Sequence, residues 1–241
     1  MAMLQACLNG GRSRRNHSGV PVTPEQIASD AKAAFAAGAS EFHFHPRGPD
    51  ELESLAADAI AAAIDAVRSA VPGAPIGLST HAGIPPGGAA RIPFLRTWHR
   101  KPDYVSVNLV EEDAPEVMAI MRDMGIGIEA GIWSVADARR FVALPGSRHC
   151  LRILIEINEQ DIANGLQAVD GILDVLKAAG IYLPILLHGL DEGKWPFIRE
   201  AHARGFDTRV GLEDGFTMPD GTRASGNAAQ VAAARALART G

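Results

Sequence analysis

Residues 33–47 read AAFAAGASEFHFHPR, and this stretch contains a helix end, a turn and a short strand in succession. The alanine-rich segment stops at Gly38, in the position where a helix commonly ends in a left-handed conformation. The run that follows, 40–45, is short and apolar and predicts a buried strand. The same succession recurs along the chain, so this stretch predicts a fold of alternating strands and helices.

Eight apolar runs have the length of buried strands. They are 3–8, 40–45, 75–79, 103–108, 125–129, 150–156, 183–188 and 207–213. Helical segments are predicted after each of them, at 24–37, 51–70, 88–99, 114–123, 134–143, 159–178, 193–204 and 226–239. Good caps open several of these segments: Thr23 precedes a proline at the first helical position, Ser134 precedes ADARRF, and Pro49-Asp50 precedes ELESLAADAI.

Eight strand–helix units in 241 residues predict an α/β protein that is a single (β/α)₈ TIM barrel over 1–241. Parallel crossovers are right-handed, and such barrels typically need about 250 residues. A doubly wound open sheet is the alternative. That fold commonly has a glycine-rich nucleotide-binding turn after its first strand, whereas the turn here, NGGRS (9–13), lacks the GxGxxG spacing.

Composition limits the class of protein. The chain is 47% hydrophobic with a net charge of −5 and a pI near 5.9, so we expect no nucleic-acid partner. Its two cysteines, Cys7 and Cys150, indicate no disulfide framework. No run approaches about 18 apolar residues, and no secretory leader is evident. We therefore expect a cytoplasmic protein that does not enter a membrane.

If the barrel forms, its active site lies at the carboxyl ends of the strands. Every predicted strand has a polar residue at or just beyond that end. These residues are Asn9, His43, His45, Arg47, Ser79, Thr80, His81, Asn108, Glu111, Glu129, Glu156, His188, Arg209, Glu213 and Asp214. Buried polar groups are costly unless they are paired or bind a metal, so this concentration favours an enzyme over a scaffold.

His43 and His45 are the strongest candidates for metal ligands. In a strand they point to the same face, roughly 7 Å apart, with Phe44 on the other face. A polar pair on a wet surface is the other interpretation. Glu213, in VGLEDG at the end of the last predicted strand, is the candidate third ligand, although a helix-capping acid is the alternative. Two histidines and one carboxylate leave Zn²⁺ an open position, which is typical of catalytic sites.

The remaining polar groups suggest chemistry on a keto acid. Arg209 with Asp214 forms a guanidinium–carboxylate pair suited to removing a proton from a carbon next to a ketone. Arg47 and Ser79 are placed to hold a carboxylate. Alternatives stay open for Ser79 and Thr80, which also suit helix caps. Glu129, Glu156 and His188 also suit structural hydrogen bonding.

Several segments in order resemble one family. They are NG (9–10), VPVTPEQIASDA (20–31), AGASEFHFHPR (37–47), LSTHAG (78–83), YVSVNL (104–109) and RVGLED (209–214). They are similar to the β-keto acid cleavage enzymes, and HxHxR together with GLED is the most specific part.

The resemblance implies a (β/α)₈ fold and a Zn²⁺-dependent reaction of a β-keto acid with acetyl-CoA, giving acetoacetate and a new CoA thioester. It implies that His43, His45 and Glu213 bind zinc, and that Arg209 and Asp214 are the proton-abstracting pair. Ser79 would help to hold the substrate. We also expect Arg47, Thr80, Asn108 and Glu129 to contact substrate, and we expect a homo-oligomer, either a dimer or a tetramer.

Two departures from the family pattern are visible. Where the enzyme for the amino-substituted keto acid has an acidic residue after its first strand, this chain has Arg12, which predicts a substrate with an anionic or neutral tail. After the sixth strand the chain reads IEINEQDIANGL in place of a glycine-rich loop, so the sequence does not identify the CoA contacts. A zinc hydrolase, a metal-dependent aldolase and a barrel that only binds a small molecule remain the alternatives.

Overall fold

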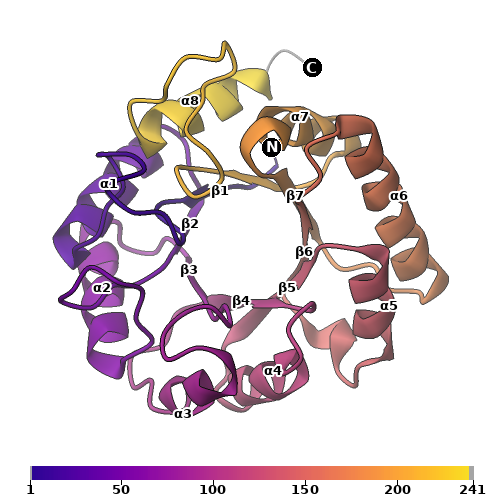
Figure 1. Ribbon diagram of the computed structural model, residues 1–241, viewed down its shortest axis with the longest axis horizontal. Helices are drawn as coiled ribbons and strands as arrows, with labels where there is room; N and C mark the ends of the chain where they lie inside the picture. Colours follow the sequence, from indigo (N-terminus) through magenta and orange to yellow (C-terminus); the bar gives the residue numbers. More distant parts are fainter. Residues whose placement is uncertain (1, 239–241) are drawn as a thin grey trace.

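Eight parallel strands form one sheet that curls into a nearly closed barrel, with the helices around it (Figure 1). The computed structural model describes residues 2–238. The order is β7-β6-β5-β4-β3-β2-β1-β8, so each strand pairs with its neighbour in the chain and β1 also pairs with β8. A single parallel bridge, Leu186 to Asp207, joins β7 to the segment just before β8. The predicted (β/α)₈ fold is confirmed, and the open sheet is wrong.

All eight predicted strands are present. They are β1 Leu4–Cys7, β2 Glu41–Phe44, β3 Ile76–Ser79, β4 Tyr104–Asn108, β5 Gly127–Ile132, β6 Arg152–Ile157, β7 Ile185–Gly189 and β8 Thr208–Val210. The α-helices are α1 Pro24–Ala36, α2 Ala57–Ala70, α3 Ile92–Leu95, α4 Ala114–Asp123, α5 Val135–Ala143, α6 Ile162–Ala178, α7 Lys194–Arg204 and α8 Asn227–Leu237. Short 3₁₀ turns occur at η1 Gly88–Arg91, η2 Ser147–His149 and η3 Asp191–Gly193. Residue 239, the expected end of the last helix, lies outside the described residues.

Two predicted helices are shorter than expected. The one expected at 51–70 begins at Ala57 because the preceding residues form a turn, in which Gly48 N donates to Leu52 O and Glu51 has a positive φ of 63°. The one expected at 88–99 is confined to η1 and α3. It ends at Leu95, where the Thr97 backbone and hydroxyl both bond the Phe94 carbonyl.

The alternation along β2 separates the core from the site. Phe42 and Phe44 are fully buried in the main hydrophobic cluster. His43, between them, faces a cavity inside the barrel. The period of two in a strand thus places one set of side chains against the helices and the other in the barrel interior.

A buried ionic network fills the barrel one layer below that cavity. Glu41, Tyr104 and Arg152 each lie two residues before a cavity-lining residue of the same strand, so they point inward one step deeper. Arg152 donates to Glu41, and it donates to Glu129 at 2.5 Å. Gln5 bonds both carboxylates and the Tyr104 hydroxyl. These ionic groups are therefore paired, which offsets the cost of burying them.

No helix among residues 2–238 is long and apolar enough to cross a membrane. Both cysteines are free and buried.

Candidate active site

A cavity of about 320 Å³ opens at the carboxyl ends of the strands. Its lining comes from seven strands or the loops after them. The lining residues are Gly11, His43, His45, Glu53, Ser79, His81, Gly83, Ser106, Asn108, Trp133, Leu154, Glu156, Arg209 and Glu213. Most are polar, and eight of the polar residues expected at the strand ends are among them. The cavity therefore lies at the end of the barrel where (β/α)₈ enzymes carry their active sites.

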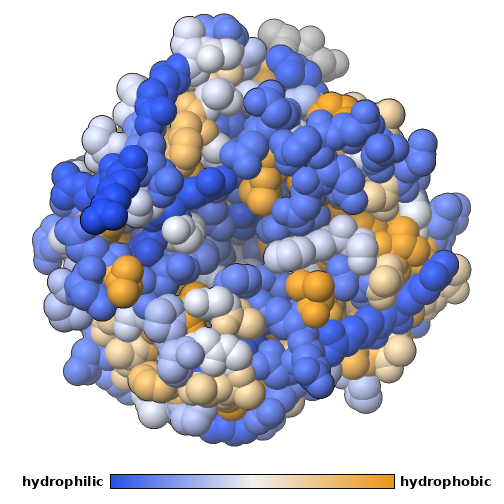
Figure 2. Space-filling model, viewed as in Figure 1, coloured by the Kyte–Doolittle hydropathy of each residue, from blue (hydrophilic) through white to orange (hydrophobic). Residues whose placement is uncertain are grey.

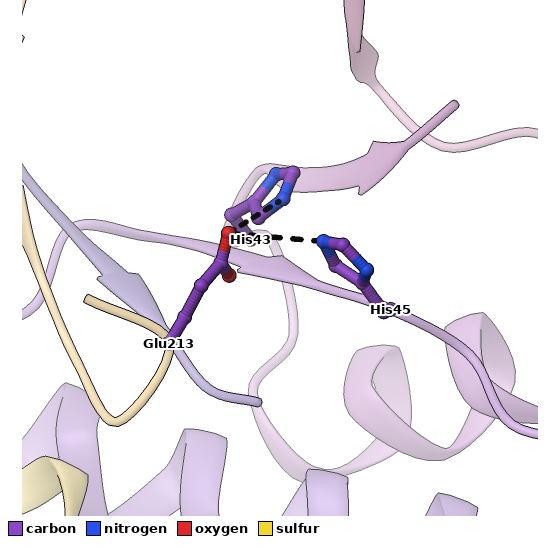
Figure 3. A group of neighbouring side chains, drawn as sticks. All are labelled: His43, His45 and Glu213. Carbon is purple, nitrogen blue, oxygen red and sulfur yellow. Dashed lines mark ion pairs between the residues drawn. The ribbon is translucent and has the colours of Figure 1, made fainter. Parts of the chain in front are cut away.

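His43, His45 and Glu213 converge on one point of this cavity (Figure 3). Glu213 Oε1 lies 3.8 Å from His43 Nε2 and 3.7 Å from His45 Nε2. One ligand atom from each residue can be chosen so that all three lie within 4.8 Å of one another. This spacing fits three ligands around a single cation.

Asn9 holds His45 in place. β2 ends at Phe44, and the next residue bonds the Asn9 side chain: His45 N donates to Asn9 Oδ1 at 2.8 Å, and Asn9 Nδ2 donates to His45 O at 3.0 Å. This corrects the expected strand end at residue 45. The Asn9 amide makes the two backbone hydrogen bonds that a neighbouring strand would otherwise make. These bonds fix the backbone of His45 and hence the direction of its side chain.

Glu213 lies in a turn beyond the last strand. β8 ends at Val210, because Asp214 N bonds Gly211 O and Leu212 N bonds Asn227 Oδ1 at 2.7 Å. This corrects the expected strand at 207–213. Gly211 is required there, since a Cβ atom would collide with the Cys7 carbonyl. The turn aims the Glu213 carboxylate back over the barrel.

Glu53 is a site residue that the sequence did not reveal. Its carboxylate makes a short hydrogen bond with His45 Nδ1. A carboxylate on the far nitrogen of a histidine fixes the ring and makes Nε2 a better metal ligand. Residues 48–56 form an irregular turn without a periodic pattern, so the sequence carried no signal for this contact.

The two histidines have opposite electrostatic surroundings. Burial lowers the pKa of His43 to about 3, so this ring is neutral and offers a lone pair. Burial also disfavours the charge on His45, but the nearby carboxylates of Glu213 and Glu53 outweigh burial and raise its pKa to about 9. A cation that binds here therefore competes with the proton on His45.

Arg209 connects the candidate ligand Glu213 to the buried Asp214. Its Nη2 lies 3.0 Å from Glu213 Oε1 and 2.8 Å from Asp214 Oδ1, and its Nε lies 3.1 Å from the same Asp214 oxygen. Burial would raise the pKa of Asp214, but Arg209 outweighs it and keeps the pKa below the usual value. Asp214 is fully buried and does not line the cavity, so Arg209 is the member of the pair that faces a substrate.

His188 lies between two carboxylates beneath the cavity. Its Nδ1 is 3.5 Å from Asp214 Oδ1, and its Nε2 is 3.4 Å from Glu156 Oε2. Burial and Arg209 oppose the imidazolium, yet these two carboxylates keep the pKa of His188 above its usual value. Glu156 lines the cavity, whereas His188 is enclosed.

The wall after β3 and β4 presents smaller polar groups. Ser79 Oγ accepts from His81 N at 3.2 Å, which leaves the Ser79 hydroxyl proton free to point elsewhere. Asn108 lines the cavity beside it. The buried Arg91 supports this wall by binding Glu111 Oε2 at 2.6 Å.

Four residues expected to contact substrate lie outside the cavity lining. Thr80 is fully buried and donates to Ser106 O at 2.7 Å. Arg47 donates to the carbonyls of Gly10 and Arg12, so it braces the loop after β1. Thr80 and Arg47 thus lie outside the lining of this cavity, and the expectation that they contact substrate stays a prediction.

Glu129 and Arg12 are also displaced from the expected positions. β5 continues to Ile132, three residues beyond the predicted end, and Glu129 lies deeper, in the ionic network with Arg152. Arg12 donates to Glu213 O at 3.2 Å and pairs with Asp191, also at 3.2 Å. Trp133, just beyond the end of β5, also lines the cavity.

Comparisons with known proteins agree with this geometry. The sequence pattern of the beta-keto acid cleavage enzyme family matches residues 2–241. The 3-oxoadipate:acetyl-CoA acetyltransferase of Cupriavidus necator is 26% identical over 250 residues, covering 93% of this chain and 83% of that protein. The 3-keto-5-aminohexanoate cleavage enzyme of Acetoanaerobium sticklandii is 34% identical over 79 residues, covering 32% of this chain and 29% of that enzyme.

Among solved structures, ObcA superposes with a TM-score of 0.71 at 20% identity. The match covers 92% of this chain and 62% of that chain, so this chain spans under two thirds of the length of ObcA. ObcA has also been solved as a ternary complex with a C4-CoA adduct and oxalate. At this identity the likeness concerns the fold alone.

Proposed function

Because the chain belongs to the beta-keto acid cleavage enzymes, we propose that it transfers the acyl part of a β-keto acid to coenzyme A in exchange for acetyl-CoA. The products are acetoacetate and a new acyl-CoA. The observation that carries the proposal is the convergence of His43, His45 and Glu213 beside Arg209 in one cavity.

The three ligands fit a divalent cation, and we propose Zn²⁺. His45 Nε2 and Glu213 Oε2 are buried atoms without a hydrogen-bond partner, which a cation would satisfy. The imidazole and carboxylate ligand set, with Glu53 behind His45, is typical of catalytic zinc. A bound cation would supply Lewis acidity at the keto oxygen of the substrate.

The Arg209–Asp214 pair takes the proton from the carbon between the keto and carboxylate groups. Arg209 faces the cavity, so it receives the substrate proton while its Nη2 proton passes over 2.8 Å to Asp214 Oδ1. Ser79, and Asn108 beside it, provide hydrogen bonds that orient the substrate carboxylate. These roles require no displacement of the buried Asp214.

The carbon exchange then balances with acetyl-CoA alone. The substrate carbanion attacks the thioester carbonyl, a carbon–carbon bond forms, and CoA thiolate leaves. The thiolate attacks the original keto carbon, the bond between the second and third substrate carbons breaks, and the pair returns its proton. The substrate tail departs on CoA, and acetoacetate remains.

We propose a substrate with an anionic or neutral tail. Arg12 stands beside the ligand-bearing turn, where its positive charge disfavours an ammonium group. A relative whose name specifies 3-oxoadipate, a keto acid with a second carboxylate, covers most of the chain and agrees with this choice. Arg12→Glu is expected to raise the KM for anionic substrates selectively. Unchanged selectivity would show that Arg12 does not select the substrate tail.

The test is a panel of β-keto acids assayed with acetyl-CoA for acetoacetate release. Protein stripped by a chelator should be inactive and should recover on addition of Zn²⁺. Substrate cleavage that proceeds without acetyl-CoA would identify an aldolase or hydrolase and refute the proposal.

A further inference from the structure

A second hollow, of about 350 Å³, is bordered by the loop that joins β1 to α1. Gly11 of this loop lines the active-site cavity, and Arg14 and the segment 18–21 of the same loop line the second hollow. The far wall is the first half of α1, with Gln26, Ser29 and Asp30. The loop between β1 and α1 therefore borders both the active-site cavity and the second hollow.

Arginines are concentrated around this loop. Arg14 and Arg15 are exposed, and Arg223 reaches the loop by donating to Asn16 O at 2.6 Å. Arg14, Arg15 and Arg223 form no ion pair with a carboxylate anywhere in residues 2–238, whereas Arg12 is paired with Asp191. Figure 2 shows strongly hydrophilic side chains standing out over α1 and α8 on this face.

Phe216 and His17 hold this group of arginines together. The Cζ atoms of Arg12 and Arg223 lie 5.3 and 5.6 Å from the centre of the Phe216 ring, within range of cation–π attraction. The His17 ring stacks on the same phenyl ring, and its Nε2 lies 2.8 Å from Ala224 O. The loop after β1 and the loop after β8 are thus fastened to each other, and two cations stay close despite their repulsion.

Asp30 is the acidic residue among those lining the hollow. Its carboxylate accepts from Asn227 Nδ2 at 2.5 Å. This hydrogen bond directs the Asp30 carboxylate toward α8. Asp30 forms no ion pair with Arg14, Arg15 or Arg223, so it does not neutralise their charge.

We propose that the hollow and its arginines bind the nucleotide end of coenzyme A, the 3′-phosphorylated adenosine diphosphate. Arg14 and Arg15 contact the phosphates, with Arg223 adding charge. The inference rests on the proposed acetyl-CoA-dependent reaction. Guanidinium groups bind phosphate through two parallel hydrogen bonds, and unpaired arginines carry no cost of breaking an existing ion pair. Because the same loop lines the active-site cavity through Gly11, the proposal places the pantetheine arm along this loop.

The test compares two acetyl donors in an Arg14→Ala/Arg15→Ala double variant. Acetyl-CoA carries the phosphates, and acetyl-pantetheine lacks them and the nucleotide. We expect the KM for acetyl-CoA to rise roughly 10- to 100-fold, the size expected for lost charge-assisted hydrogen bonds. The kcat/KM for acetyl-pantetheine should equal that of the unaltered protein. Arg139→Ala, which removes an exposed arginine of α5, is the matched control and should change neither value.

An unchanged KM for acetyl-CoA, or an equal loss with acetyl-pantetheine, would overturn the inference. Calorimetric titration with CoA alone separates this outcome from failure of the proposed reaction. If the unaltered protein binds CoA and the double variant does not, the site stands even if no keto acid is cleaved. If both bind CoA equally, the site is elsewhere while the proposed reaction remains intact.

Discussion

Glu53 orients one candidate ligand without touching the metal position. Its hydrogen bond to His45 Nδ1 keeps Nε2 directed at the site. Glu53→Gln should therefore weaken Zn²⁺ binding by roughly 10- to 100-fold, the usual effect of losing such a partner. Chelator competition measures the dissociation constant. Glu51→Gln, an exposed acid of the same turn, is the control, and equal zinc affinity in the two variants would contradict the assigned role.

Asp30 gives the protein a pH-dependent loss of stability. Burial raises its pKa from 3.8 to about 6, even though Asn227 donates to it. The folded state therefore holds this proton more tightly than the unfolded state, and stability falls as pH rises from about 4 to about 6. Asp30→Asn should remove this loss, gaining at most about 3 kcal/mol relative to the unaltered protein above pH 6 and little near pH 4. Urea unfolding at both pH values measures it, and a gain that is the same at both would contradict it.

Lys194, at the start of α7, anchors the turn that follows the candidate ligand Glu213. Its buried ammonium donates to the carbonyls of Gly215 and Thr217, both at 2.9 Å, and to Gln230 Oε1 at 3.0 Å. Lys194→Met leaves these acceptors unsatisfied, so the free energy of unfolding should fall by about 2–4 kcal/mol. Chemical denaturation measures the loss. Lys177→Met, at an exposed position of α6, should have almost no effect, and similar stabilities of the two variants would refute the anchor.

The positions of the strands could be predicted from the periodicity of the sequence. Their ends could not, where a side chain from a distant segment terminates the strand. His43 and His45 follow from the two-residue period of a strand. The short end of β2 depends on the Asn9 side chain, and the end of β8 depends on Asn227, a partner 15 residues from the Leu212 amide it binds. No local pattern announces such partners. Glu129 was expected at the end of its strand, but β5 continues to Ile132. An apolar run does not show which of its residues is the last of the strand.

At the scale of the whole molecule, the nearly closed barrel surrounds a buried ionic network. Arg152→Met would leave Glu41 and Glu129 buried without their cation, so we expect a loss of about 3–5 kcal/mol in the free energy of unfolding. Arg100→Met, which breaks an exposed pair with Asp65, should cost at most about 1 kcal/mol. Urea unfolding of both variants makes the comparison. Equal losses would show that the network does not stabilise the barrel.

The central claim concerns the whole molecule: one cavity joins a cation site to acetyl-CoA-dependent carbon exchange. The most direct measurement supplies acetyl-CoA labelled with ¹³C at the thioester carbonyl, together with a β-keto acid that is turned over, and follows the label by NMR. The account predicts that the label appears at the keto carbon of acetoacetate, and that His43→Ala abolishes its transfer. Label recovered only in acetate, or acetoacetate formed without label, would contradict it.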